Sequence, residues 1–385
     1  QMCIRDRSKA ANADASHVVV IGGGWAGWGA AKTLCEAGVR VTLVDGMPDP
    51  TGRTPMRTAS GKPFEAGTRG FWRDYPNINA LTDELGLTDV FTEFTTSAFW
   101  SPAGPEATAP VFGDGLQLPS PLGQAMATTK NFKRLPVADC LRIAGLSVAM
   151  LDLNRNEETF RRYDAIDALT LFRQLGITER MIDEFLRPIL LVGLFKPPEE
   201  LSAAVTMELL YYYALAHQDS FDVRWIRSGS IAEQLIAPLA ERLLDSGLLT
   251  VLGGTLATRL NLDQPGEAIR SVEVCCKATG RSSVVDDVDA VVLAVGAKGM
   301  HALMAESPRC SDVLPELAAA GGLGAIDVVS VRLWLDRTIA VADPANVFSR
   351  FDALQGAGAT FFMLDQLQHV DPVSYTHLRA HETGW

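Results

Sequence analysis

The chain has 385 residues, of which 47% are hydrophobic and 21% charged, an ordinary composition for a folded globular protein. At about 150 residues per domain, this length predicts two or three domains or one large interrupted domain. The 34 basic and 46 acidic residues give a net charge of −12, which argues against nucleic acid as the main partner because phosphate binding needs a positive surface.

The cysteine content and the hydropathy pattern exclude further classes of protein. The 6 cysteines include no C-x-x-C pair, so they predict neither a disulfide framework nor a metal site, and they favour a reduced, intracellular setting. No apolar run reaches the length of about 18 residues that a membrane-spanning helix requires.

The two ends of the chain resemble translated sequencing-adaptor read-through: QMCIRDRS at residues 1–8 and VSYTHLRAHETGW at residues 373–385. We therefore leave both segments out of the reasoning about the fold, as one does with an expression tag. On this interpretation we expect the natural protein to extend beyond both ends.

A βαβ unit is predicted at the start of the remaining sequence. Val18–Ile21 is a short, continuous apolar run that is typical of a buried parallel strand. A glycine cluster and an Ala- and Leu-rich helix follow, and Gly38 ends that helix. Val39–Val44 forms the second strand, which is closed by Asp45.

The middle of the chain is predicted to be helical, and strands return after it. From about residue 121 to residue 217 nearly all segments have helical patterns, and Asp164 is the expected N-cap of a helix that ends at Gly176. Ser230 and Glu233 have the spacing of a capping box for a helix that Pro238 should kink. Strands are expected at 223–226, 249–253, 255–261, 270–277, 289–295, 326–336 and 359–364.

The glycine cluster is the motif that carries chemistry. It fits G-x-G-x-x-G, follows a strand, opens a helix and precedes an acid 23 residues after its first glycine, which are the conditions for a dinucleotide fingerprint. The expected roles are a tight turn at the first glycine, a close approach of backbone to pyrophosphate at the second, and helix–strand packing at the third. The six residues are Gly22, Gly23, Gly24, Trp25, Ala26 and Gly27.

The rest of the adenosine half of a dinucleotide is predicted from the same unit. Backbone amides around Trp25 and Ala26 lie at the start of the helix, where its dipole favours phosphate. Asp45 is expected to accept hydrogen bonds from the ribose hydroxyls and to repel a 2′-phosphate, which disfavours NADP. FAD and NAD share this fingerprint, so the motif alone does not choose between them.

The segment after the second strand resembles the superfamily of flavin-dependent amine oxidases and carotenoid desaturases. Thr51-Gly52-Arg53 stands where that superfamily has a Gly-Gly-Arg turn, and an acid-x-Gly follows at Glu65–Gly67. The stretch EAGTRGFWRDYPN over Glu65–Asn77 is similar to the carotene (phytoene and zeta-carotene) desaturase branch. The sequence departs from this pattern at Thr51, and at Arg69, where carotene desaturases commonly have His.

This resemblance implies an α/β fold, α+β overall, with FAD as the cofactor. A Rossmann-like FAD-binding domain with a parallel sheet is expected from 17–76 and 228–300. A largely helical substrate or cap domain is expected from 77–227 and 301–372. The C-terminal FAD segment of the superfamily, a Gly-Asp stretch before a last helix, is absent from the sequence before the residues that resemble adaptor read-through.

The resemblance also implies roles for particular residues. Gly52 and Arg53 are expected at the flavin phosphate or ring edge, and Leu256 is expected to offer backbone groups to adenine. Arg69, Phe71, Trp72 and Tyr75 either line the passage near the flavin or simply pack a core. No catalytic triad or metal site is expected, because the flavin carries the chemistry.

The function that follows is dehydrogenation of a lipophilic substrate, an apolar polyene such as a carotene, with electrons passed to a quinone or oxygen. Apolar stretches at Leu146–Leu153 and Phe185–Phe195 either line a tunnel, touch a membrane surface or form buried helices. The alternatives are an amine or protoporphyrinogen-type flavin oxidase, a flavin-dependent carotene cis–trans isomerase, and a non-catalytic flavin-binding fragment. The compartment stays open, with a plastid or membrane association among the options.

Overall fold

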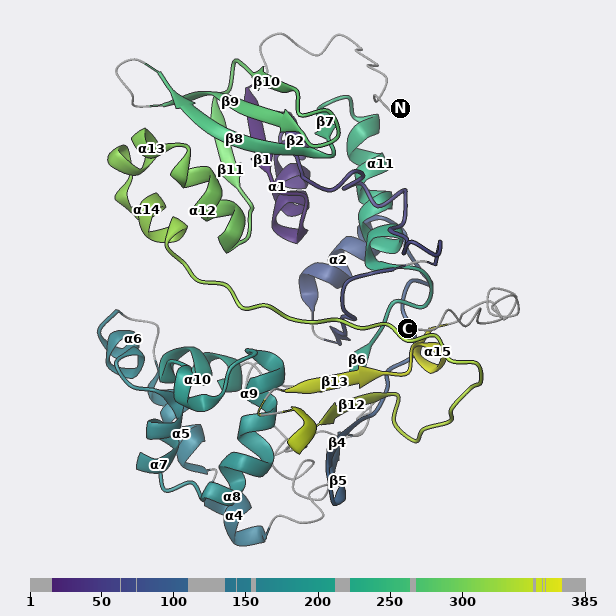
Figure 1. Cartoon of the computed structure of the whole chain (residues 1–385), viewed down its shortest axis with the longest axis vertical. Coiled ribbons are helices and arrows are strands. Elements are labelled where there is room, and N and C mark those ends of the chain that lie inside the picture. Colours follow the sequence, from purple (N-terminus) through teal and green to yellow (C-terminus); the bar gives the residue numbers. More distant parts are fainter. Residues whose placement is uncertain are drawn as a thin grey trace, which may run out of the picture. The chain divides into compact units, whose positions relative to one another are not determined.

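The computed structural model describes residues 16–62, 64–73, 75–109, 136–142, 144–153, 157–211, 222–263, 268–348, 351–354, 356 and 358–368 (Figure 1). The two segments that resemble read-through, 1–8 and 373–385, lie outside the described residues. The chain divides into two compact units, with boundaries after Glu65, Ser228 and Val329. The first unit therefore contains the predicted nucleotide fingerprint, and the second contains most of the helices.

The first unit is built on a parallel sheet of four strands, in the order β11-β1-β2-β7. These strands are β1 (His17–Ile21), β2 (Arg40–Val44), β7 (Leu249–Leu252) and β11 (Ala290–Leu293). Strand β1 pairs in parallel with both β2 and β11, although β11 follows it by more than two hundred residues. This confirms the predicted Rossmann-like sheet assembled from two distant parts of the sequence.

Helix α1 (Trp25–Glu36) connects β1 to β2 and contacts helix α11 (Ala237–Asp245). The face of α1 that turns inward carries Trp28, Ala31 and Cys35, which are all buried. Burial raises the pKa of the Cys35 thiol to about 11, so this cysteine is a packing residue rather than a reactive group.

An antiparallel sheet of three strands, β8 (Thr255–Leu262), β9 (Ile269–Cys276) and β10 (Ser282–Val285), packs against the parallel sheet. The two sheets share one apolar core, because Val19 and Val44 of the parallel sheet cluster with residues of β8 and β9. This core fixes the strands that end at the fingerprint.

Three helices close the same core: α12 (Ala297–Ala305), α13 (Pro308–Val313) and α14 (Pro315–Gly321). From residue 301 onward they lie in the part of the chain that the sequence assigned to the cap domain. In the structure, Leu303, Met304 and Cys310 of these helices are buried against β8 and β9 in the first unit. The assignment of the two units to cofactor and substrate stays a prediction.

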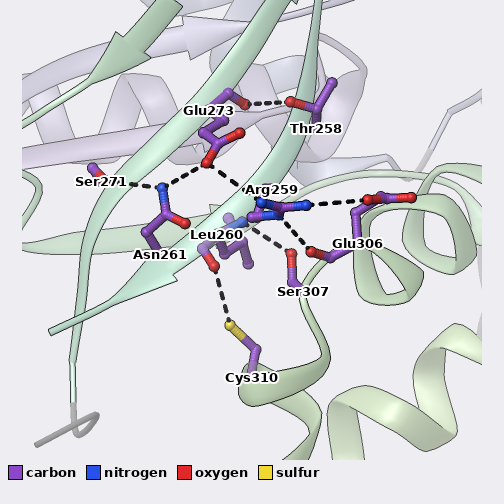
Figure 2. A network of polar contacts seen from close by, with 9 residues as sticks. All are labelled: Thr258, Arg259, Leu260, Asn261, Ser271, Glu273, Glu306, Ser307 and Cys310. Atoms are coloured by element: carbon purple, nitrogen blue, oxygen red, sulfur yellow. Dashed lines mark hydrogen bonds and ion pairs between the residues drawn. The ribbon is translucent and has the colours of Figure 1, made fainter. Parts of the chain in front are cut away.

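A polar network joins strand β8 to this helical end (Figure 2). The Arg259 guanidinium donates to the backbone oxygen of Glu306 at 2.9 Å, and its other end lies 3.9 Å from a carboxylate oxygen of Glu273. The backbone N–H of Leu260 donates to the hydroxyl of Ser307 at 2.9 Å, in a buried position. Because Ser307 stands between α12 and α13, the network fixes where the first helix ends and the next begins.

The second unit contains a mixed sheet in the order β13-β12-β4-β5, a two-stranded ribbon of β3 and β6, and a helical cluster. Its strands are β3 (Phe71–Trp72), β4 (Ser97–Ser101), β5 (Gly104–Ala109), β6 (Val223–Arg224), β12 (Ala345–Phe348) and β13 (Ala359–Phe362). Its helices are α2 (Pro76–Glu84), α4 (Val137–Arg142), α5 (Ala144–Asp152), α6 (Glu157–Asp164), α7 (Ala168–Gln174), α8 (Glu179–Met181), α9 (Arg187–Gly193), α10 (Ala203–Tyr211) and α15 (Leu364–Leu367).

The helical cluster buries its own core, whose centre includes the fully buried Phe172, Met181 and Met207. Leu146 and Leu190 of the two apolar stretches belong to this core, whereas Val148 and Leu151 are exposed at 67% and 74%. The tunnel, membrane-surface and buried-helix interpretations of these stretches therefore stay predictions. Within the described residues, no helix combines the length and the apolar character needed to cross a bilayer.

Two prolines are accommodated by widened helical turns rather than by simple kinks. A π-helical turn at Ile182–Leu186 precedes Pro188, and another at Ala232–Ile236 precedes Pro238. Proline has no N–H to donate, and its ring crowds the preceding turn of an α-helix. A turn in which residue i bonds to residue i+5 relieves this crowding while the chain stays helical.

The predicted capping box of Ser230 is confirmed, since its hydroxyl and N–H both donate to the Glu233 carboxylate.

The prediction of a strand at 326–336 is wrong. This segment is extended but pairs with no strand among the described residues. Its alternating apolar side chains face solvent, with Val329, Val331 and Leu333 exposed at 87%, 72% and 75%. Alternation predicts an amphipathic strand, but a strand also needs a neighbouring edge to pair its backbone, and no local pattern reports whether one exists.

The prediction that Asp164 is an N-cap is also wrong, because Asp164 is the last residue of α6. Asp167 is the N-cap of α7, and its carboxylate accepts from the backbone N–H of Thr170 at 2.8 Å and from the Thr170 hydroxyl. The hydrogen bonds from the Thr170 side chain and N–H lower the pKa of Asp167. The two acids lie three residues apart and both precede the same apolar segment, so the sequence alone does not distinguish them as N-caps.

These two acids provide a matched pair for a stability test. Asp167→Ala should destabilise the protein by about 1 kcal/mol, the usual contribution of an N-cap, whereas Asp164→Ala should have little effect. Because the pKa of Asp167 is lowered on folding, its contribution is complete above the ordinary value of 3.8 and is lost as the pH falls through the lower folded value. Thermal unfolding between pH 7 and pH 3 measures this, and equal effects of the two variants would contradict the assignment.

Candidate functional site

The glycine turn between β1 and α1 depends on close backbone approaches. A Cβ at Gly22, whose φ is +108°, would lie 2.2 Å from the backbone oxygen of Ala294, just after β11. A Cβ at Gly27 would lie 1.8 Å from the backbone oxygen of Gly22. The turn therefore folds back on itself beside the carboxyl ends of β1 and β11. In an open parallel sheet, ligands bind where the strand order reverses, and β1 and β11 form that position here.

The first turn of α1 presents free backbone groups at this position. Gly24 is the N-cap, no side chain caps the helix, and no acidic residue lies in its first turn. Gly24, Trp25 and Ala26 are all exposed, and a Cβ at Gly24 would meet nothing within 4 Å. The first amides of a helix have no partner within it, and its dipole is positive there. The geometry fits a pyrophosphate group.

Asp45 stands at the end of β2, next to the glycine turn. One carboxylate oxygen accepts from the backbone N–H of Gly23 at 2.7 Å, and the other accepts from the backbone N–H of Met47 at 2.6 Å. Two amides thus fix the direction of the carboxylate relative to the fingerprint. Its contact to Gly23 has no signal in the sequence, because it joins residues that follow two different strands.

The loop from Pro48 to Thr54 carries the predicted Gly52-Arg53 turn. Gly52 has φ +76°, and a Cβ there would lie 2.3 Å from the backbone oxygen of Ala232 in the π-helical turn. Only glycine fits between the loop and that helix. Arg53 is 46% exposed, and its Nε lies 3.8 Å from a carboxylate oxygen of Glu241, an exposed ion pair of little strength. The guanidinium is therefore available to a ligand.

Leu256 follows the turn between β7 and β8. Its side chain is 48% exposed, and a Cβ at Gly46 would come within 2.9 Å of it. The Lys277 ammonium donates to the backbone oxygen of Gly46 at 3.1 Å. Leu256 and Lys277 thus meet at the residue that follows Asp45. The predicted contact of Leu256 with adenine stays a prediction.

The four predicted substrate residues belong to the second unit. Phe71 is buried at 4% exposure, and its ring centroid lies 5.0 Å from that of Phe91. Trp72 packs against a cluster that includes Trp225. Arg69 is exposed, and Tyr75 is half-buried beside the start of α2. Phe71 and Trp72 therefore serve the packing of this unit, and a substrate role for the four residues stays a prediction.

The fold and the site define an α/β protein with a Rossmann-type dinucleotide site. Residues 26–380 match the family of flavin-containing amine oxidoreductases, and the chain belongs to this family. FAD is therefore the cofactor, and it fits the uncapped helix start, the open side of Gly24 and the fixed Asp45 carboxylate.

Several characterised proteins resemble this chain in sequence. The 15-cis-phytoene desaturase of Capsicum annuum is 24% identical over 336 residues, which cover 87% of this chain and 55% of that protein. The 15-cis-phytoene desaturase of Synechococcus elongatus is 25% identical, covering 87% of this chain and 68% of that protein. The carotenoid phi-ring synthase of Streptomyces griseus is 28% identical, covering 85% of this chain and 61% of that protein. The chain thus spans little more than half the length of several of these relatives.

Solved structures of amine oxidases share the fold. A variant of putrescine oxidase superposes with a TM-score of 0.52 at 18% identity, over 74% of this chain and 58% of that protein. Cyclohexylamine oxidase from Brevibacterium oxydans superposes with a TM-score of 0.51 at 17% identity, over 78% of this chain and 63% of that protein. At such identities the likeness concerns the fold alone.

The glycine contacts provide a matched test of the turn. Gly27→Ala should destabilise the protein by about 3 kcal/mol or more, because the added methyl group overlaps a backbone oxygen that has no room to move. Gly29→Ala adds the same methyl group two residues later, where nothing lies within 4 Å, and should stabilise α1 by about 0.5–1 kcal/mol. Urea unfolding compares the two, and a tolerated Gly27→Ala would contradict the described turn.

Proposed function

We propose that the protein is an FAD-dependent oxidoreductase that dehydrogenates an apolar polyene such as a carotene and passes the electrons to a quinone or oxygen. The observation that carries this proposal is that relatives named as 15-cis-phytoene desaturases match 84% to 88% of this chain. The glycine turn and Asp45 support the cofactor half of the proposal.

The reaction forms one carbon–carbon double bond by removing two hydrogen atoms from adjacent carbons. One leaves with its electron pair as a hydride, and the other leaves as a proton that passes to water. When bound, FAD would supply the hydride-accepting chemistry, and the quinone or oxygen would take up the two electrons together with two protons. The residues of this chain bind and orient: backbone amides at Gly24–Ala26 hold the pyrophosphate, and Asp45 holds the ribose.

A second candidate within the same chemistry is modification of a carotenoid ring. It is favoured by the two relatives named carotenoid phi-ring synthase, which are 29% and 28% identical, somewhat more than the desaturases. The two candidates differ in substrate, since one acts on a linear polyene and the other on a cyclic carotenoid.

The cofactor part is tested with the purified protein and its visible spectrum. Asp45→Ala should weaken FAD binding about ten-fold or more, because charge-assisted hydrogen bonds to the ribose are lost. Arg53→Ala should weaken it further at the phosphate or flavin end. Arg57→Ala is the matched control, because Arg57 is exposed and bonds only the backbone oxygen of Gly61 among the contacts described. A colourless protein that binds NADH tightly would end the flavin assignment.

The substrate part is tested by product analysis of the FAD-loaded protein in lipid vesicles that contain phytoene, zeta-carotene or a cyclic carotene, with a quinone. We expect a product with two fewer hydrogens from a linear polyene and none without an acceptor. Turnover without an acceptor and with unchanged mass would identify an isomerase. Exclusive turnover of the cyclic carotene favours ring modification, and oxidation of an amine instead would refute the carotene proposal.

A further inference from the structure

We propose that Asp49 and Thr51 are positioning residues for FAD. They form a hydrogen-bonded clamp, defined as Asp49, Thr51 and Thr54, that sets the Gly52-Arg53 turn before the cofactor binds. The inference rests on the cofactor site described above and assigns a role to the threonine that replaces a glycine common in related sequences.

The Asp49 carboxylate is the centre of the clamp. One of its oxygens accepts from both the backbone N–H and the hydroxyl of Thr51, and the other accepts from the backbone N–H of Thr54 at 2.8 Å. Burial alone would raise the pKa of Asp49, but the hydrogen bonds from Thr51 and Thr54 outweigh it and lower the pKa. The carboxylate is therefore charged near neutral pH and holds both sides of the turn.

The clamp is tied directly to the fingerprint helix. The buried Trp28 of α1 donates from its indole Nε1 to the backbone oxygen of Pro50 at 3.2 Å. A Cβ at Gly23 would lie 2.9 Å from the Cβ of Pro50, so the loop also touches the glycine turn. Pro50, which lies between Asp49 and Thr51, is thus fixed against the part of the chain that is expected to bind pyrophosphate.

On its other side, the turn is fixed against the π-helical turn at Ala232–Ile236 by the close approach of Gly52 to Ala232. Thr51 lies between these two contacts, and it is 7% exposed. A glycine at this position would have many backbone conformations, whereas a β-branched residue has few. The Thr51 hydroxyl donates its hydrogen bond to Asp49 within the clamp, which orders the turn. A turn that is already ordered loses less entropy when a ligand binds.

A positioning role differs from a purely structural one in what a substitution changes. A structural clamp would affect the stability of the protein without FAD and leave its affinity for FAD intact. A positioning clamp changes the affinity for FAD even where the folded protein without cofactor is nearly as stable as before.

The test measures FAD affinity by quenching of flavin fluorescence, and the melting temperature of the cofactor-free protein, in the same variants. Thr51→Val removes only the hydroxyl and should weaken FAD binding about five- to ten-fold, while Thr51→Ser should restore it. Asp49→Ala should weaken binding at least as much, because it removes the acceptor of both Thr51 and Thr54. Adding Thr51→Val to Asp49→Ala should cause little further loss, because the Thr51 hydroxyl then has no carboxylate to bond. Thr58→Val is the control, since Thr58 forms a comparable hydroxyl turn with Ser60 and Lys62 in the exposed part of the loop.

A lower melting temperature with an unchanged FAD affinity in Thr51→Val would overturn the proposal, as would independent, additive losses in the double variant. Failure of the unsubstituted protein to bind FAD would overturn it together with the cofactor assignment. No substrate is used, so a protein that binds FAD and converts no carotene refutes the proposed function and leaves the clamp in place.

Discussion

The contact between the backbone oxygen of Gly22 and Gly27 is the constraint on which the first unit depends. It lets α1 begin directly at the end of β1, without a side chain between helix and strand. The same close turn brings Gly22 against Ala294 after β11, and so joins strands from the two ends of the unit. A helix that starts this close to the sheet must present its unpaired amides to the edge where the strand order reverses.

A set of hydrogen bonds fixes the neighbouring loops relative to the glycine turn. Asp45 holds Gly23, Asp49 holds Thr51 and Thr54, and Trp28 holds Pro50. All these contacts are made by side chains to backbone groups, so they specify loop conformation rather than bury apolar surface. A dinucleotide contacts mostly backbone atoms in such a site, and the precision of the loops is therefore part of binding.

The parts of the fold that the sequence predicted correctly are those whose signals are local. The βαβ unit combines a continuous apolar strand, a glycine turn, a helix and a closing acid within thirty residues or so, and each signal supports the next. The apolar run at 289–295 was placed in the same sheet because a parallel sheet buried on both faces needs such strands.

The errors arose where the outcome depends on distant partners. The segment at 326–336 has the alternation of a strand, but pairing requires an edge elsewhere in the chain. Asp164 and Asp167 are equally good caps by composition, and the position of α7 against its core decides between them. The hydrogen bond of Asp49 to the Thr51 backbone had a local signal, because aspartate side chains commonly bond the backbone two residues on. Its consequence, the fixing of Gly52 against Ala232, is non-local and could not be predicted.

The same distinction separates recognition of the cofactor from recognition of the substrate. The expected FAD contacts come from a motif with a fixed spacing and from backbone groups, which tolerate much sequence change around them. A lipophilic substrate is selected by the shape of an apolar surface, and many combinations of side chains produce similar surfaces. Phe71 and Trp72 illustrate this, because their contacts with Phe91 and with the Trp225 cluster already account for their burial. The family match establishes the flavin chemistry, whereas relatives at about a quarter identity support the carotenoid substrate only as a proposal.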